Sequence, residues 1–457
     1  MKKLSICIFT LLTSISVQAQ WSTISTMEAI RKDHVVFAYP NGKVLAAGGW
    51  TGSENLQTSE WFDYGSVTWT NSTGEMSVPH TTAAGVVLSN GKALMIGGYT
   101  GSANTPICEL YDTTTHIWSA AGSLNEGRSY HTATLLANGK VLVTGGFNGT
   151  INLSSCELYD PSTNAWTAVP GGLTTGRSYH TATLLDDGRV LVAGGFNPNA
   201  GFQLSSVEMY NPQTNAFSAG LNMANTRAYH GATKLNNGRV LVAGGERFTG
   251  NSPYAYDGMT SCEIYNPATN SWSNAADLPI GAAYNQLISV ANNEVLMIAG
   301  ARNTNYSPSF SYAPATSHIY RVATNTWVES PMALDGRIGY AAAKWSNEKV
   351  IVTGGTGQNE VELFTAAVST GTNALQNKLF VQVYPTPSMG LFAVEVDFGT
   401  KDVAFQISDL QGKSVSVSQT YDGRLWQFDM SNQPKGMYRI AVLKEGKPVS
   451  IQPILLH

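Results

Sequence analysis

The chain has 457 residues, of which 13% are charged and 45 are glycine, and its formal net charge is −4. This composition is typical of a turn-rich all-β globular protein and provides no acidic or basic tail. Because a phosphate-binding protein usually carries a clustered positive excess, the charge argues against a nucleic-acid partner.

The first 19 residues have the pattern of a secretory signal peptide. Lys2 and Lys3 precede an apolar run that ends in the small-residue sequence Val17-Gln18-Ala19. We predict a signal peptide at residues 1–19, with cleavage after Ala19. No other stretch is long and apolar enough to cross a bilayer, so we expect an exported, soluble protein without a membrane span.

Residues 20–365 contain a sevenfold repeat. In each copy a short apolar strand ends in two glycines or a remnant of the pair, at steps of 48 to 56 residues. The first glycines of these signals are Gly48, Gly97, Gly145, Gly194, Gly244, Gly300 and Gly354. Strand-like segments repeated at this period are typical of a β-propeller. We therefore predict an all-β fold whose main part is a seven-bladed propeller.

The third copy shows the elements expected in one blade. Alternating apolar residues predict a first strand over 130–136, a tight turn at Asn138-Gly139 and a second strand over 140–146. A third strand is expected at 156–160 and a fourth at 164–169, after a Pro-Ser-Thr-Asn turn. Such a four-stranded antiparallel sheet has two apolar faces, so neighbouring sheets must pack face to face around an axis.

The double glycine, the Glu-x-Tyr triplet of the third strand and an aromatic residue downstream resemble the repeats of kelch β-propellers, over about residues 20 to 365. The fourth-strand aromatic is found in six copies, at Trp69, Trp118, Trp166, Phe217, Trp272 and Trp327. The seventh copy lacks it, and Trp21 follows the predicted cleavage site instead. We predict that the strand around Trp21 completes the seventh blade beside residues 362–364, because ring closure removes open sheet edges.

Three cysteines remain after cleavage, and all lie at one third-strand position: Cys108, Cys156 and Cys262. Their odd number and their placement in different repeats argue against a disulfide framework, and no paired Cys or His spacing indicates zinc. We interpret them as small buried residues. The sequence has no phosphate loop, nucleophile elbow or metal-binding helix motif, so we expect no metal, no cofactor and no catalytic residue.

Five arginines occur where the innermost strands are expected to begin: Arg31, Arg128, Arg177, Arg227 and Arg337. In kelch proteins that bind peptides, arginines at this position line the central pocket, and the resemblance implies the same placement here. A ring of guanidinium groups favours a carboxylate, sulfate or phosphate, so one hypothesis is a mouth that binds an anionic ligand. The alternative is that each arginine pairs with the third-strand acid of its own repeat. Those acids are Glu60, Glu157, Glu208, Glu263 and Glu362.

Three consecutive copies carry a Tyr-His dipeptide, at Tyr130-His131, Tyr179-His180 and Tyr229-His230. They resemble the repeats of galactose and glyoxal oxidases, which are copper-radical enzymes on a kelch ring. The alternative is ordinary packing, since a repeat produces the same dipeptide in successive blades, and an isolated histidine is usually structural. We favour packing.

Blades five and six have long loops between their second and third strands, on the same face as the arginines. These loops hold Tyr254, Tyr256, Tyr306 and Tyr312. Exposed aromatic rings suit stacking on a sugar or gripping an extended peptide. The alternative is that each loop folds over itself and buries its own tyrosines.

After the last repeat, residues 366–378 are small and polar and predict a linker. Short alternating strands in residues 379–457 predict a small β-sandwich. The segments 383–392, 407–415 and 433–443 resemble the C-terminal sorting domain of type IX secretion cargo in the Bacteroidota. That resemblance implies the type IX machinery as a partner, export across the outer membrane, and a secreted or cell-surface protein.

Together these features favour an exported, non-catalytic recognition protein. Its ligand would be a glycan or a protein, possibly anionic, bound on the loop face by the five arginines and four loop tyrosines. The alternatives are an extracellular enzyme on the same ring, similar to a copper-radical oxidase or to a kelch-type sialic-acid mutarotase, and a structural adhesin.

Overall fold

The structure is a computed structural model of the chain. It describes residues 19–39, 42–63, 66–248, 256–298, 300, 316–331, 337–366, 381–384, 391–396, 403–409, 413–421, 425–444 and 447–456. These residues fall into two compact units, one within 15–369 and the other within 370–457. The predicted signal peptide, apart from Ala19, and the predicted linker, apart from Ala366, lie outside the described residues.

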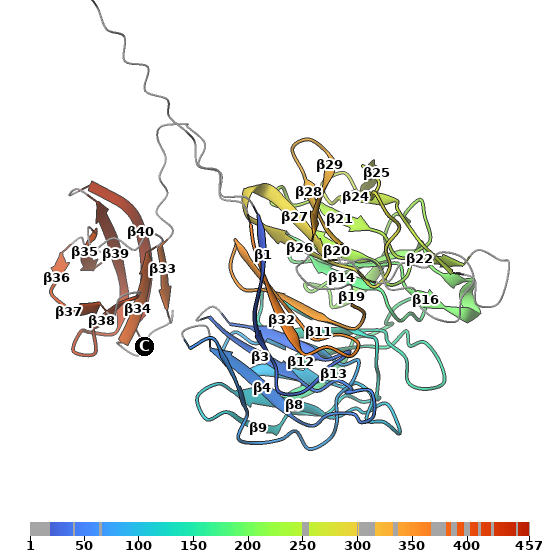
Figure 1. The fold of residues 1–457 in the computed structure, drawn as a ribbon, viewed down its shortest axis with the longest axis horizontal. Helices are drawn as coiled ribbons and strands as arrows, with labels where there is room; N and C mark the ends of the chain where they lie inside the picture. The colour runs from blue at the N-terminus through green and yellow to red at the C-terminus, as the bar shows by residue number, and fades with distance from the viewer. Residues whose placement is uncertain are drawn as a thin grey trace, which may run out of the picture. The chain divides into compact units, whose positions relative to one another are not determined.

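The first unit contains seven four-stranded antiparallel sheets in the described part of the chain, which are the blades of a propeller (Figure 1). Blades one to three consist of β2 (Val35–Ala38), β3 (Lys43–Ala47), β4 (Ser59–Asp63) and β5 (Thr68–Asn71); β6 (Ala84–Val87), β7 (Ala93–Ile96), β8 (Cys108–Asp112) and β9 (Ile117–Ala120); β10 (Thr132–Leu135), β11 (Val141–Thr144), β12 (Cys156–Asp160) and β13 (Ala165–Ala168). Blades four to six consist of β14 (Thr181–Leu184), β15 (Val190–Ala193), β18 (Val207–Asn211) and β19 (Ala216–Ala219); β20 (Gly231–Lys234), β21 (Val240–Ala243), β24 (Cys262–Asn266) and β25 (Ser271–Ala275); β26 (Gln286–Val290), β27 (Glu294–Ile298), β28 (Thr316–Arg321) and β29 (Thr326–Pro331).

The seventh blade joins the two ends of this unit and closes the ring. It consists of β30 (Ala341–Lys344), β31 (Lys349–Thr353), β32 (Glu360–Thr365) and, as its outer strand, β1 (Gln20–Thr26). Figure 1 shows β1 running beside β32. The innermost strands contact one another in succession, and β30 contacts β2, so the circle is complete. The predicted seven-bladed ring with an N-terminal closing strand is confirmed.

Trp21 takes the role that the fourth-strand aromatic has in the other blades. It lies opposite Phe364 in the β1–β32 pairing, with ring centroids 5.2 Å apart. Its indole Nε1 donates to Ser317 Oγ of the preceding blade at 3.1 Å. In blade two, Trp118 likewise donates to Ser59 Oγ of blade one at 2.8 Å. The same aromatic bridge therefore ties blade seven to blade six.

The cores lie between neighbouring blades. One cluster combines Leu94 and Ile96 of blade two with Val141 and Val143 of blade three, all fully buried. Burial of each such side chain contributes about 1.5 to 3 kcal/mol. Cys108 belongs to this cluster, and burial raises the pKa of its thiol to about 12. All three described cysteines are buried and free, as predicted.

Two small hairpins lie on the loop face of the ring, next to each other (Figure 1). In blade four, β16 (Phe196–Asn197) pairs with β17 (Phe202–Gln203) around the short helix η1 (Pro198–Ala200). In blade five, β22 (Glu246–Phe248) pairs with β23 (Tyr256–Gly258), and β17 contacts β22. A second short helix, η2 (Ala291–Asn293), forms the first turn of blade six.

The second unit is a β-sandwich, as predicted. One sheet consists of β33 (Val381–Tyr384), β34 (Leu391–Val396), β38 (Leu425–Asp429) and β37 (Ser418–Tyr421). The other consists of β36 (Ser414–Val415), β35 (Val403–Asp409), β39 (Gly436–Lys444) and β40 (Lys447–Leu456). Phe428 of the first sheet packs with Ile407 and Ile440 of the second, and this cluster forms the core between the sheets.

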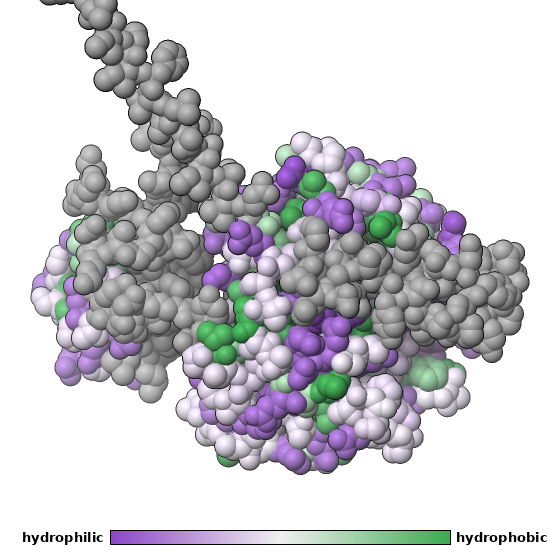
Figure 2. All heavy atoms as spheres, in the orientation of Figure 1, coloured by the Kyte–Doolittle hydropathy of each residue, from purple (hydrophilic) through white to green (hydrophobic). Residues whose placement is uncertain are grey.

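The surface of the molecule mixes residue types. In Figure 2 hydrophobic residues stand singly or in small groups among hydrophilic ones on the visible, coloured part of the face. No helix in the described ranges has the length and apolar composition of a membrane span.

Candidate functional site

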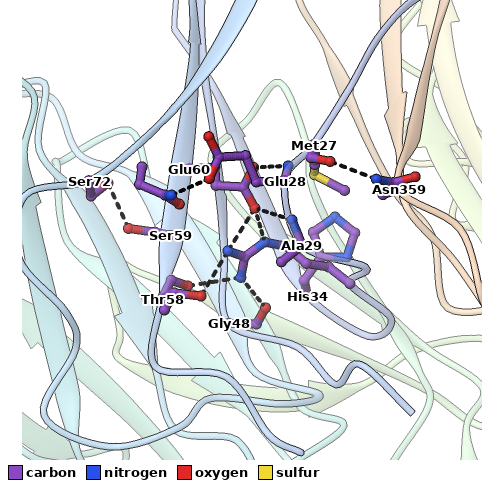
Figure 3. Close-up of polar contacts among 12 residues, drawn as sticks. Met27, Glu28, Ala29, His34, Gly48, Thr58, Ser59, Glu60, Ser72 and Asn359 are labelled. Atoms are coloured by element: carbon purple, nitrogen blue, oxygen red, sulfur yellow. Dashed lines mark hydrogen bonds and ion pairs between the residues drawn. The ribbon is translucent and has the colours of Figure 1, made fainter. Parts of the chain in front are cut away.

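The five arginines lie inside the blades and not at the surface. The Arg31 side chain has no exposed surface, and its Nε donates to Glu60 Oε1 at 3.0 Å. Its Nη1 donates to the carbonyl oxygens of Gly48 and Thr58, both at 2.9 Å. Figure 3 shows Glu60 also accepting from the backbone of Glu28, at 2.6 Å. Both charges are therefore fully partnered within blade one.

The other four arginines repeat this arrangement. Each guanidinium donates to the first carbonyl of the glycine pair and to the third-strand glutamate of its own blade. The shortest Nη2–carboxylate distances are 2.8 Å for Arg128–Glu157, 2.8 Å for Arg177–Glu208, 2.7 Å for Arg227–Glu263 and 2.9 Å for Arg337–Glu362. In blade two His80 stands in for the arginine, with Nε2 2.8 Å from Glu109 Oε2.

These contacts support the pairing alternative and correct the expectation of an anion-binding ring. A guanidinium with 0% side-chain exposure does not meet a ligand that arrives from solvent. In each of these blades the guanidinium Nη atoms already donate to carbonyl oxygens and to the glutamate, which is how a protein accommodates a buried charge. We therefore assign Arg31, Arg128, Arg177, Arg227 and Arg337 to the support of the blades.

Three of the four loop tyrosines, Tyr254, Tyr306 and Tyr312, lie outside the described residues. The fourth, Tyr256, begins strand β23, and only its backbone is described. Their role in ligand binding stays a prediction.

The arginines position a second set of residues, which we call the axial ring. Two residues after each arginine position, just before the innermost strand, the backbone has a positive φ in every blade. The seven residues of the axial ring are Asp33, Thr82, Tyr130, Tyr179, Tyr229, Tyr284 and Gly339. For a residue other than glycine this conformation costs on the order of 1 kcal/mol or more, and such strain concentrates at functional sites.

Backbone hydrogen bonds join the axial ring from blade to blade. The N–H of Asp33 donates to the carbonyl of Gly339, that of Thr82 to Asp33, and that of Tyr130 to Thr82, at 2.7 to 3.1 Å. The same bond continues through the tyrosines of blades four, five and six. This chain of bonds runs from Gly339 through six consecutive blades to Tyr284 and ties the members of the axial ring to one another.

Four consecutive members of the axial ring form a stack, which we call the tyrosine wall. Ring centroids are 4.2 Å apart for Tyr130–Tyr179, 3.9 Å for Tyr179–Tyr229 and 4.2 Å for Tyr229–Tyr284. The wall is only partly buried, and Tyr130 is 37% exposed. Burial raises the pKa of each hydroxyl, so all four stay neutral. The wall therefore presents partly exposed aromatic rings with neutral hydroxyl groups.

The histidines of the Tyr-His dipeptides point the other way, into the contacts between blades. His180 Nε2 lies 2.8 Å from Thr144 Oγ1, and His230 Nε2 lies 2.9 Å from Thr181 Oγ1, each in the preceding blade. Burial lowers the pKa of His131 and of His230 to about 3. The described ranges contain no group of three His, Cys, Asp or Glu side chains that could hold a metal. The imidazoles of His180 and His230 therefore contribute to the contacts between neighbouring blades.

A second circle of aromatic residues surrounds the axial ring. In blades one to five the residue after the glycine pair forms a β-bridge to the residue just before the axial ring, as in Lys32–Trp50 and Ser129–Phe147. This position holds Trp50, Tyr99, Phe147 and Phe196 in blades one to four, and Glu246 in blade five. The hairpins of blades four and five add a stacked pair, Phe202 and Phe248, with centroids 4.9 Å apart.

Two carboxylates lie among these aromatic residues. Asp33 belongs to the axial ring, and its Oδ2 is 3.8 Å from Lys32 Nζ. Burial raises the pKa of Asp33, and it raises that of Glu246 to about 7. The charge of Glu246 acts on Tyr229 and Tyr284, so it lies beside the wall.

Three of the four wall tyrosines were identified from the sequence as parts of Tyr-His dipeptides, but their stacking on one another was not predicted. Tyr284 was missed because Ala282 replaces the arginine in blade six and Asn285 replaces the histidine. Counting two residues from every arginine position, with or without an arginine, would have found the axial ring.

Comparison with known proteins identifies the class. The model of the KLHDC2/KLHL20/DRC7 kelch-repeats domain matches residues 34–245 and again 83–300, together more than half of the chain. The chain therefore belongs to the kelch-repeat family. The secretion system C-terminal sorting domain matches residues 382–456, which indicates export as a secreted or cell-surface protein through the type IX machinery. No curated protein matches the chain.

Two solved structures share the fold. A novel fungal alcohol oxidase of the AA5 family, in complex with copper, is 12% identical with a TM-score of 0.66, over 96% of this chain and 99% of that one. The structure of YjhT is 18% identical with a TM-score of 0.51, over 68% of this chain and all of that one. At these identities the likeness extends to the fold alone.

Proposed function

We propose that this protein is an exported, non-catalytic recognition protein that binds a glycan at the axial ring of its propeller. The signal peptide at residues 1–19 directs it to the first membrane, and the sorting domain delivers it through the outer membrane. The tyrosine wall is the observation that carries this proposal. Four neutral, partly exposed rings, with neighbouring centroids 3.9 to 4.2 Å apart, form a rigid aromatic stack.

This surface suits a sugar because aromatic faces pack on the C–H groups of a pyranose at low entropic cost, while polar groups fix its orientation. Asp33 and Thr82 supply such polar groups on the same ring. Tyr254, Tyr256, Tyr306 and Tyr312 belong to loops of blades five and six, and we propose that these loops extend the contact area.

A glycan array with the mature protein tests the proposal. The double variant Tyr179→Ala/Tyr229→Ala should lose binding, whereas Tyr179→Phe/Tyr229→Phe keeps the rings and should retain most of it. Unchanged melting temperatures would show that both variants fold. An array that binds nothing, or binding that survives the alanine variant, would contradict the proposal.

The enzyme alternative has its own test. Purified protein is analysed for copper and assayed for peroxide release from alcohols and aldehydes. Stoichiometric copper together with peroxide formation would replace the binding proposal with an oxidase.

A further inference from the structure

The axial ring is divided by side-chain size into two arcs. The tyrosine wall occupies four consecutive positions, and the remaining three hold Gly339, Asp33 and Thr82 in blades seven, one and two. Asp33 is the middle residue of the small arc. Its electrostatic influence reaches both Tyr130 and Tyr284, the two ends of the wall. The charge of one carboxylate in the small arc therefore acts on both ends of the aromatic stack.

Gly339 makes room for this carboxylate. A Cβ atom at residue 339 would lie 2.6 Å from Asp33 Oδ1, closer than any real contact, and it would also collide with the Lys32 side chain. Any residue other than glycine would displace Asp33 from the small arc. The arrangement of an acid in the gap is therefore built into two blades at once.

Among the described residues, no further aromatic ring stacks on the outer face of Tyr130 or of Tyr284, the two ends of the wall. A cation is attracted to such a face, and the attraction grows when the site is partly desolvated. Glu246 adds a second acidic group beside Tyr229 and Tyr284, and with a pKa raised by burial to about 7 it is partly ionised at neutral pH. In strand β22 the side chains alternate, so Arg247 leaves the strand on the face opposite Glu246.

The positive charges nearby do not cancel this pattern. The guanidiniums under the ring are each neutralised by a glutamate of the same blade. Lys32 Nζ approaches Asp33 Oδ2 only to 3.8 Å, and its charge lowers the pKa of Asp33 by less than burial raises it. An incoming cation that loses less freedom can take the place of this lysine.

Resting on the proposed glycan function, we propose that the sugar bound at the axial ring carries a protonated amine, which lies in the small arc between Asp33 and the outer faces of Tyr130 and Tyr284. Glu246 contributes from the rim of the wall. The ligand class is thus a glycan with unacetylated amino sugars. This is the opposite charge preference from the one that the arginines suggested.

Calorimetric titration with matched probes tests the inference: a glucosamine tetramer, its fully N-acetylated counterpart and a lysine tetrapeptide. The glucosamine tetramer should bind at least tenfold more tightly than the other two. Asp33→Asn should remove that preference, and Glu246→Gln should reduce it by a factor of about 3. Glu294→Gln is the matched control, since Glu294 is also a partly buried acid with a raised pKa, but lies at the start of β27 on the opposite face.

The outcomes separate this inference from the proposed function. If the acetylated tetramer binds equally well and Tyr179→Ala/Tyr229→Ala abolishes its binding, glycan recognition stands and the proposed preference for a protonated amine is wrong. Tighter binding of the lysine peptide would assign the amine to a protein partner and overturn the sugar. If Asp33→Asn binds the glucosamine tetramer like the unmodified protein, the small arc is not the site. An empty glycan array would remove the proposed function itself.

Discussion

Acid should destabilise the propeller through its buried histidines, and one substitution isolates the effect. His34, His131, His180 and His230 occupy the same position in blades one, three, four and five, directly after the axial ring. Each is 5 to 7% exposed. Blade six has Asn285 there, also buried, so His131→Asn reproduces a residue that the fold already accepts. His131 is the best choice because neither of its ring nitrogens has a hydrogen-bond partner.

The direction and the size of the stability change follow from the pKa values of the histidines. Burial lowers the pKa of His131 from 6.5 to about 3, so between these values the unfolded chain binds a proton that the folded protein does not. Stability is therefore fully present above pH 6.5 and falls as the pH drops. At pH 5 each such histidine lowers the free energy of unfolding by about 2 kcal/mol relative to pH 7. His34, His131 and His230 together cost roughly 6 kcal/mol, a large part of the 5 to 15 kcal/mol that stabilises a typical domain. His180, whose pKa is lowered further, adds to this loss.

Urea unfolding at pH 7 and at pH 5 measures the effect. The loss of unfolding free energy between the two pH values should be about 2 kcal/mol smaller for His131→Asn than for the unmodified protein, whatever the variant does to stability at pH 7. His116→Asn is the control, because burial also lowers the pKa of His116 but its side chain is only partly buried, so this variant should change the loss less. If His131→Asn loses as much stability as the unmodified protein, His131 is not held neutral by the fold.

Three further predictions address the ring and its mouth. Arg128→Leu should cost about 3 to 5 kcal/mol in urea unfolding because it leaves Glu157 buried and unpaired, whereas Arg128→Ala/Glu157→His, which copies blade six, should cost less. Trp21→Ala should cost about 3 kcal/mol and expose the β1 edge to proteolysis, since it removes the contact with Phe364; an unchanged cleavage pattern would contradict a closing role for β1. The pKa of Glu246, raised to about 7, means that ionisation opposes folding as the pH rises from 4.5 through 7, so Glu246→Gln should be more stable than the unmodified protein at pH 8 and equal to it at pH 4. Equal stability at both pH values would refute this desolvation.

The blades could be predicted from the sequence almost residue by residue, and the errors have one cause. The predicted third strand 156–160 is identical to β12, but the second, 140–146, ends early, at Thr144. Gly145 and Gly146 have φ values of 59° and 103°, which no strand residue adopts. Similarly, the first strand begins at Thr132 and not at 130, since Tyr130 has a φ of 55°. The periodicity of apolar residues does not indicate where the backbone takes a left-handed conformation.

The candidate site was harder to predict because its geometry depends on contacts between blades. The pairing of Arg31 with Glu60 could be anticipated, since both recur in the same repeats. The stacking of Tyr179 on Tyr229 could not, because these residues are 50 positions apart and meet only when the ring closes at the right radius. The charge of the mouth was misjudged for the same reason: the guanidiniums lie beneath the surface that the axial ring forms.

In a propeller of similar blades, the residues that support the fold and the residues that bind a ligand occupy different positions of the repeat. The residues that hold the blades together must satisfy the same contacts in each copy, so the arginine, the glutamate and the glycine pair recur. A ligand without sevenfold symmetry needs the opposite, a place where the copies differ. The axial ring is such a place, because the same backbone conformation recurs in all seven blades while its residues run from glycine and aspartate to four tyrosines. The bridged position after the glycine pair differs in the same way in blades one to five, with Glu246 in blade five where the other four have aromatic rings. A uniform backbone with uneven side chains is the reason to seek the ligand there and not at the repeated arginines.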